Sequence, residues 1–262
     1  MSTYILGISG FYHDAAACII KDGEIIAAAQ EERFSRKKHD PRFPVNAINY
    51  CLEEAFIEFD DIEVVSFYDN SFLTYNRVID NLVDQGEKAL DIYEAGTISI
   101  LGDKIWIKEY LIKHFGSCGK AGKVLFCGHH MSHAASAFYP TKFNDAAVLT
   151  IDGVGEYATT TICKAEGNDI ELLKEIKFPH SLGLLYSAFT YFCGFKVNSG
   201  EYKLMGLAPY GQPKYQKLIK EKLIQIADDG SFKLNMDFFN YTHSDRMVGK
   251  KYSVETKKDM KV

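Results

Sequence analysis

Short apolar runs separated by glycine and charged residues open the chain and predict an arrangement of neighbouring strands. Residues 4–9 read as one strand, and residues 15–20 and 24–29 read as two more that form a hairpin. The turn between these two is Asp22-Gly23, a pair that suits a tight two-residue turn because both central positions need positive φ. The pattern therefore predicts three consecutive strands at the N-terminus.

The period of the pattern then becomes helical. Apolar residues recur at helical spacing just after Pro44, which suits the first turn of a helix: Ile48, Cys51, Leu52, Ala55 and Phe56. Residues 62–68 and 123–127 read as strands, and residues 73–93 and 100–115 read as helices. Strands that alternate with helices indicate an α/β fold with a mixed sheet flanked by helices.

The second half of the chain begins by repeating the first. A shift of 143 residues, without a gap, superposes a predicted strand, a glycine turn and a strand on one another: Leu6 on Leu149, Ile8 on Ile151, Gly10 on Gly153, Ala15 on Ala158, Ile19 on Ile162 and Lys21 on Lys164. This is either a chance likeness of two hairpins or a duplicated α/β unit, in which each half contributes a glycine turn to one nucleotide-binding cleft.

The C-terminal part carries less pattern. Residues 181–193 and 214–227 read as helices, residues 198–211 read as a polar turn, and little periodicity follows residue 228. The second copy is therefore expected to be incomplete, and the chain to stop partway through its architecture.

Composition narrows the function. With 262 residues, 47% of them hydrophobic, the chain can bury a core, and its net charge of -5 argues against a nucleic-acid partner. The small basic patch Arg33, Arg36, Lys37 and Lys38 is either a solvated loop or a surface that steers an anionic ligand. No apolar run predicts a membrane helix or a signal peptide, so a cytoplasmic location is expected, and the six scattered cysteines are expected to be reduced thiols.

Two histidines and an aspartate are candidate metal ligands. His129 and His133 are four residues apart, so a helix would place both on one face, while His130 points away and stays a fallback ligand. Asp152 ends an apolar strand, where its side chain can enter a cleft and complete the site. Capping or hydrogen bonding in the core would explain the histidines otherwise.

Two glycine turns are candidate anion sites. Gly153-Val154-Gly155 can direct backbone N–H groups toward a phosphate, although an ordinary hairpin turn has the same sequence. At the equivalent turn of the first copy, His13 beside Asp14 could act as a general base on a hydroxyl; alternatively, Asp14 caps the turn and His13 is merely exposed.

Five segments together resemble the N-terminal part of the O-carbamoyltransferases, the group of the nodulation-factor, cephamycin and tobramycin enzymes. The similarity runs from about residue 4 to residue 215, and the segments occur in the family's order: residues 6–17, 30–39, 129–138, 152–161 and 200–211. The resemblance implies an actin-like fold made of duplicated ribonuclease-H-like units. The first would occupy residues 1–143 and the second, incomplete, residues 144–262.

The resemblance also implies roles for particular residues. His129, His133 and Asp152 match the family's metal ligands, with iron as the expected divalent metal, and His13 matches a histidine at the acceptor site. Gly10 and the turn Gly153, Val154, Gly155 and Glu156 would contact nucleotide phosphate, and Asp14, Glu201 and Lys203 are further signature positions. The chemistry implied is formation of carbamoyladenylate from carbamoyl phosphate and ATP, then carbamoyl transfer to a hydroxyl of a sugar-like or antibiotic-like acceptor.

The chain departs from the family's pattern in two respects. No motif matches the family's further metal-binding aspartate, and the C-terminal YrdC-like domain that makes carbamoyladenylate has no counterpart here. We therefore expect a fragment or a split subunit that a missing C-terminal part or a separate subunit completes. A nucleotide- and metal-binding module without catalysis and an actin-fold phosphotransferase are the alternatives.

Overall fold

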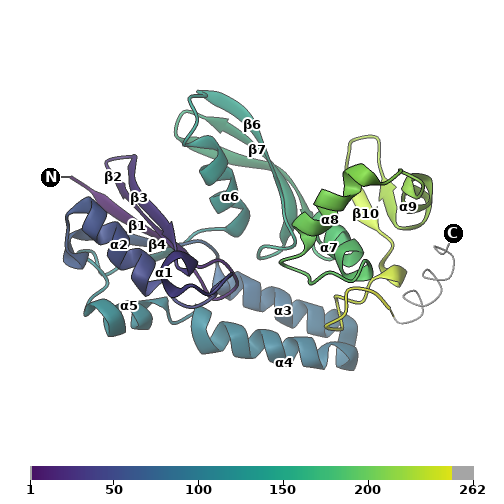
Figure 1. The fold of residues 1–262 in the computed structure, drawn as a ribbon, viewed down its shortest axis with the longest axis horizontal. Coiled ribbons are helices and arrows are strands. Elements are labelled where there is room, and N and C mark those ends of the chain that lie inside the picture. The colour runs from purple at the N-terminus through teal and green to yellow at the C-terminus, as the bar shows by residue number, and fades with distance from the viewer. Residues whose placement is uncertain (1, 250–262) are drawn as a thin grey trace. The chain divides into compact units, whose positions relative to one another are not determined.

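The computed structural model describes residues 2–249 as an α/β chain (Figure 1). Its strands are β1 (Tyr4–Ser9), β2 (Ala16–Lys21), β3 (Glu24–Gln30), β4 (Ile62–Phe67), β5 (Val124–Phe126), β6 (Asp145–Ile151), β7 (Ala158–Glu166), β8 (Asp169–Lys177), β9 (Ile224–Ile226) and β10 (Phe232–Leu234). Its α-helices are α1 (Glu32–Ser35), α2 (Val45–Ala55), α3 (Ser71–Gln85), α4 (Leu90–Ser99), α5 (Ile107–Phe115), α6 (His129–Phe138), α7 (Leu182–Phe192), α8 (Glu201–Leu207) and α9 (Gln216–Lys222).

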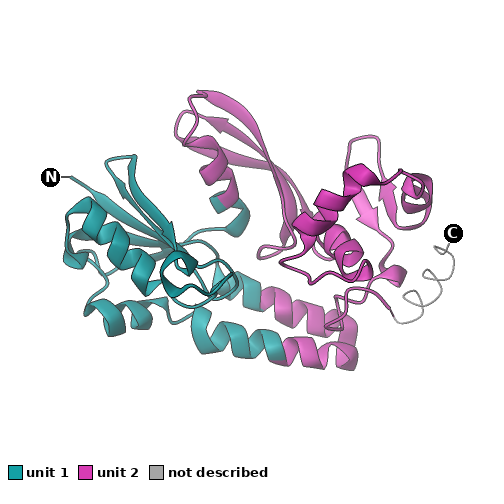
Figure 2. Ribbon diagram, viewed as in Figure 1, with its two compact units in different colours: residues 1–75, 95–132 teal, residues 76–94, 133–262 magenta. Residues whose placement is uncertain are grey.

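The chain divides into two compact units (Figure 2). The first comprises residues 1–75 and 95–132, and the second comprises residues 76–94 and 133–262. The division falls inside α3, α4 and α6, so these helices carry residues of both units. No helix in the described part of the chain is long and apolar enough to cross a membrane.

A five-stranded mixed sheet with the order β3-β2-β1-β4-β5 builds the first unit. β1 pairs antiparallel with β2 and parallel with β4, and β4 pairs parallel with β5. The turn from β2 to β3 is Asp22-Gly23, with φ of 49° and 92°, as its sequence predicts. The core lies between this sheet and helices α2 and α5, whose buried residues include Ala47, Ile48, Cys51, Leu52, Ile107 and Leu111.

A three-stranded antiparallel sheet with the order β6-β7-β8 begins the second unit. Helix α6 contributes Ala134 and Phe138 to a small core with Val148, Cys163 and Ala165 of this sheet. A separate core lies among α7, α9 and the hairpin of β9 and β10, where Ala188, Ile224, Phe232 and Leu234 are buried.

The two sheets repeat one pairing register. Leu6 pairs with Ile19, and Leu149 pairs with Ile162, which are the same positions after the shift of 143 residues. One register shift between the second and third strands also recurs, after Ile19 in the first sheet and after Ile162 in the second, and the second sheet has a further shift between Ala158 and Thr160. The backbone pairing of the two meanders therefore follows the sequence repeat.

Burial of the repeated positions is reversed. Leu6 and Ile19 are fully buried beneath α2, whereas Leu149 is 61% exposed and Ile162 is 42% exposed. The opposite face of β6 and β7, with Val148 and Cys163, is the one that packs on α6. The face of the second sheet that carries Leu149 and Ile162 is thus apolar but partly exposed. Within the described residues, no element covers this face as fully as α2 covers the equivalent face of the first sheet.

The structure differs from the sequence expectations in three helical regions. The two helices expected at 73–93 and 100–115 are α3, α4 and α5, with a short 3-10 turn and a π-turn (Ile100–Lys104) between them. The expected polar turn at 198–211 is wrong, because α8 occupies much of it. The helix expected at 214–227 ends at Lys222, and β9 follows.

Candidate functional site

Helix α6 positions the two candidate imidazoles. It begins at His129, directly after β5, and its first turn is tied to the end of β4 because Ser132 Oγ donates to the Tyr68 carbonyl at 2.9 Å. His129 and His133 lie one turn apart on this helix, as their spacing predicts. The ring of Tyr68 contacts the ring of His129 edge-on, with 5.6 Å between centroids, and limits its rotation.

Asp152 follows the last residue of β6 and faces His133. Its Oδ2 atom lies 3.5 Å from Nε2 of His133, and its Oδ1 accepts the N–H of Gly153 at 2.7 Å. The hydrogen bond that His133 donates to Asp152 raises the pKa of His133 against the opposing effect of burial. On the main chain, Ser181 Oγ donates to the Asp152 carbonyl at 3.0 Å, which fastens this residue to the N-terminus of α7.

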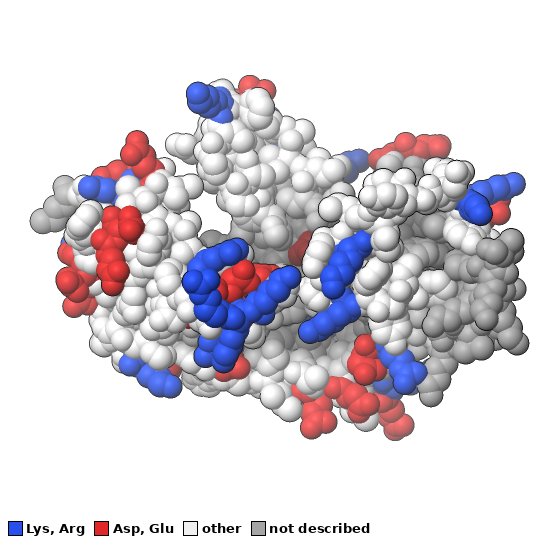
Figure 3. All heavy atoms as spheres, in the orientation of Figure 1, with Lys and Arg blue, Asp and Glu red and all other residues white. Residues whose placement is uncertain are grey.

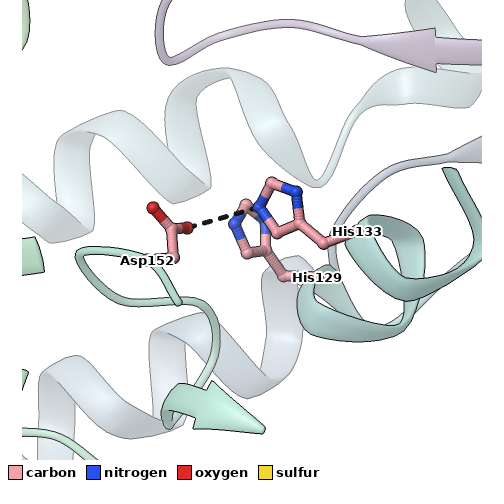
Figure 4. Close-up of side chains that lie close together, drawn as sticks. All are labelled: His129, His133 and Asp152. Atoms are coloured by element: carbon pink, nitrogen blue, oxygen red, sulfur yellow. Dashed lines mark ion pairs between the residues drawn. The ribbon is translucent and has the colours of Figure 1, made fainter. Parts of the chain in front are cut away.

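His129, His133 and Asp152 offer one ligand atom each, and these atoms lie within 4.8 Å of one another (Figure 4). Two imidazole nitrogens and a carboxylate oxygen suit first-row divalent metals such as iron or zinc, and leave coordination positions for water or substrate. The donor set therefore fits the metal that the resemblance implies. His130, the fallback ligand, is buried and is not in this group.

The glycine turn after Asp152 already uses two of its amides. The N–H of Gly153 is bonded to Asp152, and the N–H of Gly155 donates to the Ala158 carbonyl at 2.9 Å. A phosphate at this turn would have to displace these bonds or bind the remaining amides. Glu156 is buried beside the turn.

His13 and Asp14 lie together at the turn that follows β1. Nδ1 of His13 is 2.8 Å from Oδ2 of Asp14, and the imidazole remains accessible. Gly10 lies close to Arg42 and Pro44, and a Cβ at this position would meet both at an ordinary contact distance of 3.6 Å.

The remaining signature positions have structural contacts. Glu201 starts α8, where its carboxylate accepts from Ser187 Oγ at 2.8 Å and from the Asn198 N–H at 3.0 Å. Burial opposes ionisation of Glu201, yet these hydrogen bonds outweigh it and lower its pKa. Lys203 lies over the ring of Tyr202, 5.9 Å from its centroid.

Sequence reasoning missed a buried ion pair in the first unit. Nζ of Lys104 lies 2.7 Å from Asp69 and 3.1 Å from the Tyr68 hydroxyl, and both charged side chains are buried. Lys104 ends the π-turn, an element that often occurs at functional sites. No signal in the sequence separates Lys104 from the solvated lysines of a helix.

His39 was also missed as a site residue. It lies in the segment after α1, and its Nδ1 is 2.8 Å from Oδ1 of Asp14. Lysine and arginine side chains gather around acidic atoms on the face of the molecule drawn in Figure 3. Near His39 the exposed basic residues are Arg33, Arg36, Lys37, Lys38 and Arg42.

Comparisons with known proteins point to one family. A family model described as the carbamoyltransferase N-terminus matches residues 4–256. The chain is 50% identical to an uncharacterised protein of Synechocystis sp. over 96% of this chain, and 33% identical to the nodulation protein NolNO of Sinorhizobium fredii over 87%. It spans only 42% and 32% of the length of these two relatives.

Among solved structures, YeaZ from Pseudomonas aeruginosa aligns with a TM-score of 0.37 and 12% identity, covering 68% of this chain and 67% of that protein.

Proposed function

The chain belongs to the carbamoyltransferase family, whose N-terminal region it matches, and from this premise we propose that it forms the N-terminal part of an ATP-dependent O-carbamoyltransferase. The complete protein uses carbamoyl phosphate and ATP to make carbamoyladenylate, and passes the carbamoyl group to a hydroxyl of a small sugar-like or antibiotic-like acceptor. The match over residues 4–256 is the observation that carries this proposal.

The fold that we propose is actin-like, with two ribonuclease-H-like units. The support is the shared register of the two meanders, in which Leu6 with Ile19 and Leu149 with Ile162 are equivalent pairs. A chance likeness of two hairpins would not be expected to preserve the register shift at the same position in both.

His13 acts as the base in the proposed reaction. Asp14 has a lowered pKa, because hydrogen bonds from His39 and His13 outweigh the effect of burial, so its carboxylate can only accept. The proton between Asp14 and His13 therefore sits on Nδ1 of His13, and Nε2 is left as an acceptor. Nε2 takes the proton of the hydroxyl on the substrate that receives the carbamoyl group, while the oxygen of this hydroxyl bonds to the carbamoyl carbon. The bond between that carbon and the phosphate oxygen of the adenylate then breaks, and AMP leaves.

His129, His133 and Asp152 would hold the divalent metal, for which iron is our proposal. When bound, this metal supplies positive charge that stabilises phosphate oxygens. Residues that would not touch the metal hold these ligands in place. The ring of Tyr68 packs against His129, and Ser181 donates a hydrogen bond to the main-chain carbonyl of Asp152. Such restraint keeps the donor atoms in place before the metal arrives.

Metal content tests the ligand assignment. The purified chain reconstituted with Fe²⁺ under anaerobic conditions should retain close to stoichiometric metal, and His133→Ala or Asp152→Ala should lose it, as measured by elemental analysis. His114→Ala is the matched control, because this imidazole stacks on Phe43 away from the candidate ligands. Stoichiometric metal in the His133 or Asp152 variant would contradict the assignment.

The reaction itself is tested with carbamoyl phosphate, ATP and a hydroxyl acceptor, with the chain alone and within a full-length relative. Carbamoyl transfer by the unaltered protein, and its loss in the His13→Gln variant, would support the proposal. ATP or AMP binding by calorimetry, without transfer in either protein, would favour a nucleotide- and metal-binding module.

A further inference from the structure

The turn that carries His13 is fastened to the segment that follows α1. The Phe11 N–H donates to the Pro41 carbonyl at 2.6 Å, and the Ala15 N–H donates to the Asp40 carbonyl at 2.9 Å. Two residues that face one another across this junction have left-handed backbone conformations, Asp14 with φ of 51° and His39 with φ of 57°. Such conformations are costly for residues other than glycine and persist where the surroundings impose them.

Asp14 bridges two imidazoles at this junction. Its Oδ2 is 2.8 Å from Nδ1 of His13, and its Oδ1 is 2.8 Å from Nδ1 of His39. Each carboxylate oxygen therefore has its own imidazole, and neither bond competes with the other. The two bonds fix the rotation of the Asp14 side chain from opposite sides.

The surroundings of His39 determine its tautomer. Nε2 of His39 is buried and has no hydrogen-bond partner among residues 2–249. A proton on this nitrogen would be an unsatisfied buried donor, so the favoured tautomer carries its proton on Nδ1. That Nδ1–H donates to Asp14, while the backbone N–H of His39 donates to Glu32 at 2.8 Å.

With its proton on Nδ1, His39 donates to one oxygen of Asp14 and leaves the other oxygen to His13. His13 is about half exposed, so its ring is accessible from solvent. The other nearby charges are arranged differently: Asp40 is bonded to Arg42, and Glu32 accepts from the His39 main chain. Asp14 is therefore the carboxylate that bridges both rings.

We propose that His39 is a positioning residue that acts through Asp14 to hold His13 in the tautomer with a free Nε2. The inference rests on the proposed role of His13 as the base and adds a histidine that the reaction does not touch. The geometry is that of a carboxylate orienting an imidazole, with a second imidazole orienting the carboxylate.

A cation site built from the same residues is the competing explanation. Asp14, Glu32 and His39 have potential ligand atoms within 4.8 Å of one another. Arg33, Arg36, Lys37 and Lys38 are exposed residues of the same segment, and their positive charge disfavours a cation there. The two 2.8 Å hydrogen bonds also already occupy both oxygens of Asp14.

Nitrogen-15 NMR of the histidine side chains of the 262-residue chain tests the proposal without any need for activity. In the unaltered chain His13 should be protonated on Nδ1 at neutral pH. His39→Leu, which removes the donor, should convert His13 to a mixture of tautomers, and His39→Asn, whose amide can replace the Nδ1–H donor, should restore the single tautomer. His114→Leu is the control in the same unit and should leave His13 unchanged.

A single Nδ1–H tautomer of His13 in folded His39→Leu would overturn the proposal. If His39→Leu does not fold, Asp14→Asn tests the proposal instead. In this variant an amide nitrogen, which donates, replaces one of the two accepting oxygens, so the imidazole that faces it must accept at Nδ1 and carry its proton on Nε2. Unchanged tautomers of both rings in Asp14→Asn would also overturn it. Loss of transfer in His13→Gln tests the base separately, so the two ideas can fail independently.

Discussion

At the scale of single residues, His133 links metal binding to pH. The hydrogen bond that His133 donates to Asp152 raises the pKa of His133, so protons compete with a metal for its nitrogen at higher pH than for an ordinary histidine. A protonated imidazole cannot bind a metal. Titration with Zn²⁺ by calorimetry should therefore show affinity that weakens as pH falls from about 8 to about 6, by up to about tenfold per pH unit below the pKa. Equal affinities at the two ends of this range would contradict the assignment of His133 as a ligand.

Gly183 is a second position with a sharp residue-scale consequence. A Cβ at this site, near the start of α7, would collide with the carbonyl oxygen of Asp152, so helix and ligand-bearing turn must separate. We expect Gly183→Ala to lower the free energy of unfolding by about 1–3 kcal/mol and to weaken metal binding.

Gly206→Ala is the matched control for this experiment. Gly206 lies in α8, where an added Cβ would meet nothing within 4 Å in the described parts of the chain beyond its own helix. Alanine there should raise the free energy of unfolding by up to about 1 kcal/mol, because it favours the helix. Thermal denaturation measures both variants, and equal effects would show that the contact with Asp152 is unimportant.

Local sequence patterns identify the candidate metal ligands, but they do not identify the residues that contact His13. His129 and His133 have helical spacing, and Asp152 comes directly after a strand, so each of these positions can be found from its immediate neighbours in the sequence. The contact between Asp14 and His39 joins two turns whose left-handed conformations depend on contacts distant in sequence. No periodicity in the chain encodes such a contact.

At the scale of elements, strands β1 to β5 and helix α2 follow the pattern of the sequence closely, whereas the short helices α1 and α8 and the short strand β9 do not. The expected turn at 198–211 contains several glycines and a proline, which suggest a loop. In the structure Glu201 accepts hydrogen bonds from Ser187 and Asn198, and these tertiary contacts hold the short helix α8. The helical propensity of seven residues alone would not do so.

Equivalent strand positions in the two sheets should respond differently to truncation. Ile19 is fully buried, so Ile19→Ala should lower the free energy of unfolding by about 2–5 kcal/mol. Ile162 occupies the same register position but is 42% exposed, and Ile162→Ala should cost less than about 1 kcal/mol. Native-state hydrogen exchange of amides in β2 and β7 measures the two effects. Similar losses would mean that the face of Ile162 is covered in solution.

At the scale of the whole molecule, the products of ATP distinguish adenylate chemistry from phosphoryl transfer. Formation of carbamoyladenylate consumes water and releases inorganic phosphate from carbamoyl phosphate and pyrophosphate from ATP, and the later carbamoyl transfer releases AMP. An actin-fold phosphotransferase releases ADP instead. We expect a full-length relative to form AMP in the presence of carbamoyl phosphate and acceptor, as followed by chromatography. ADP formation that depends on acceptor would contradict the proposed function.

The topology of the two sheets also sets an order of folding. Every pairing in β6-β7-β8 joins consecutive strands across a short connection, whereas the parallel pairs of the first sheet bring Ile8 to Phe67 and Val65 to Val124. Closing long loops costs more chain entropy and slows folding. In pulse-labelling during refolding, amides of β7 should therefore become protected before those of β4. The meander of the second unit can form while the strand that precedes Tyr68, and with it the support of His129, is still unpaired.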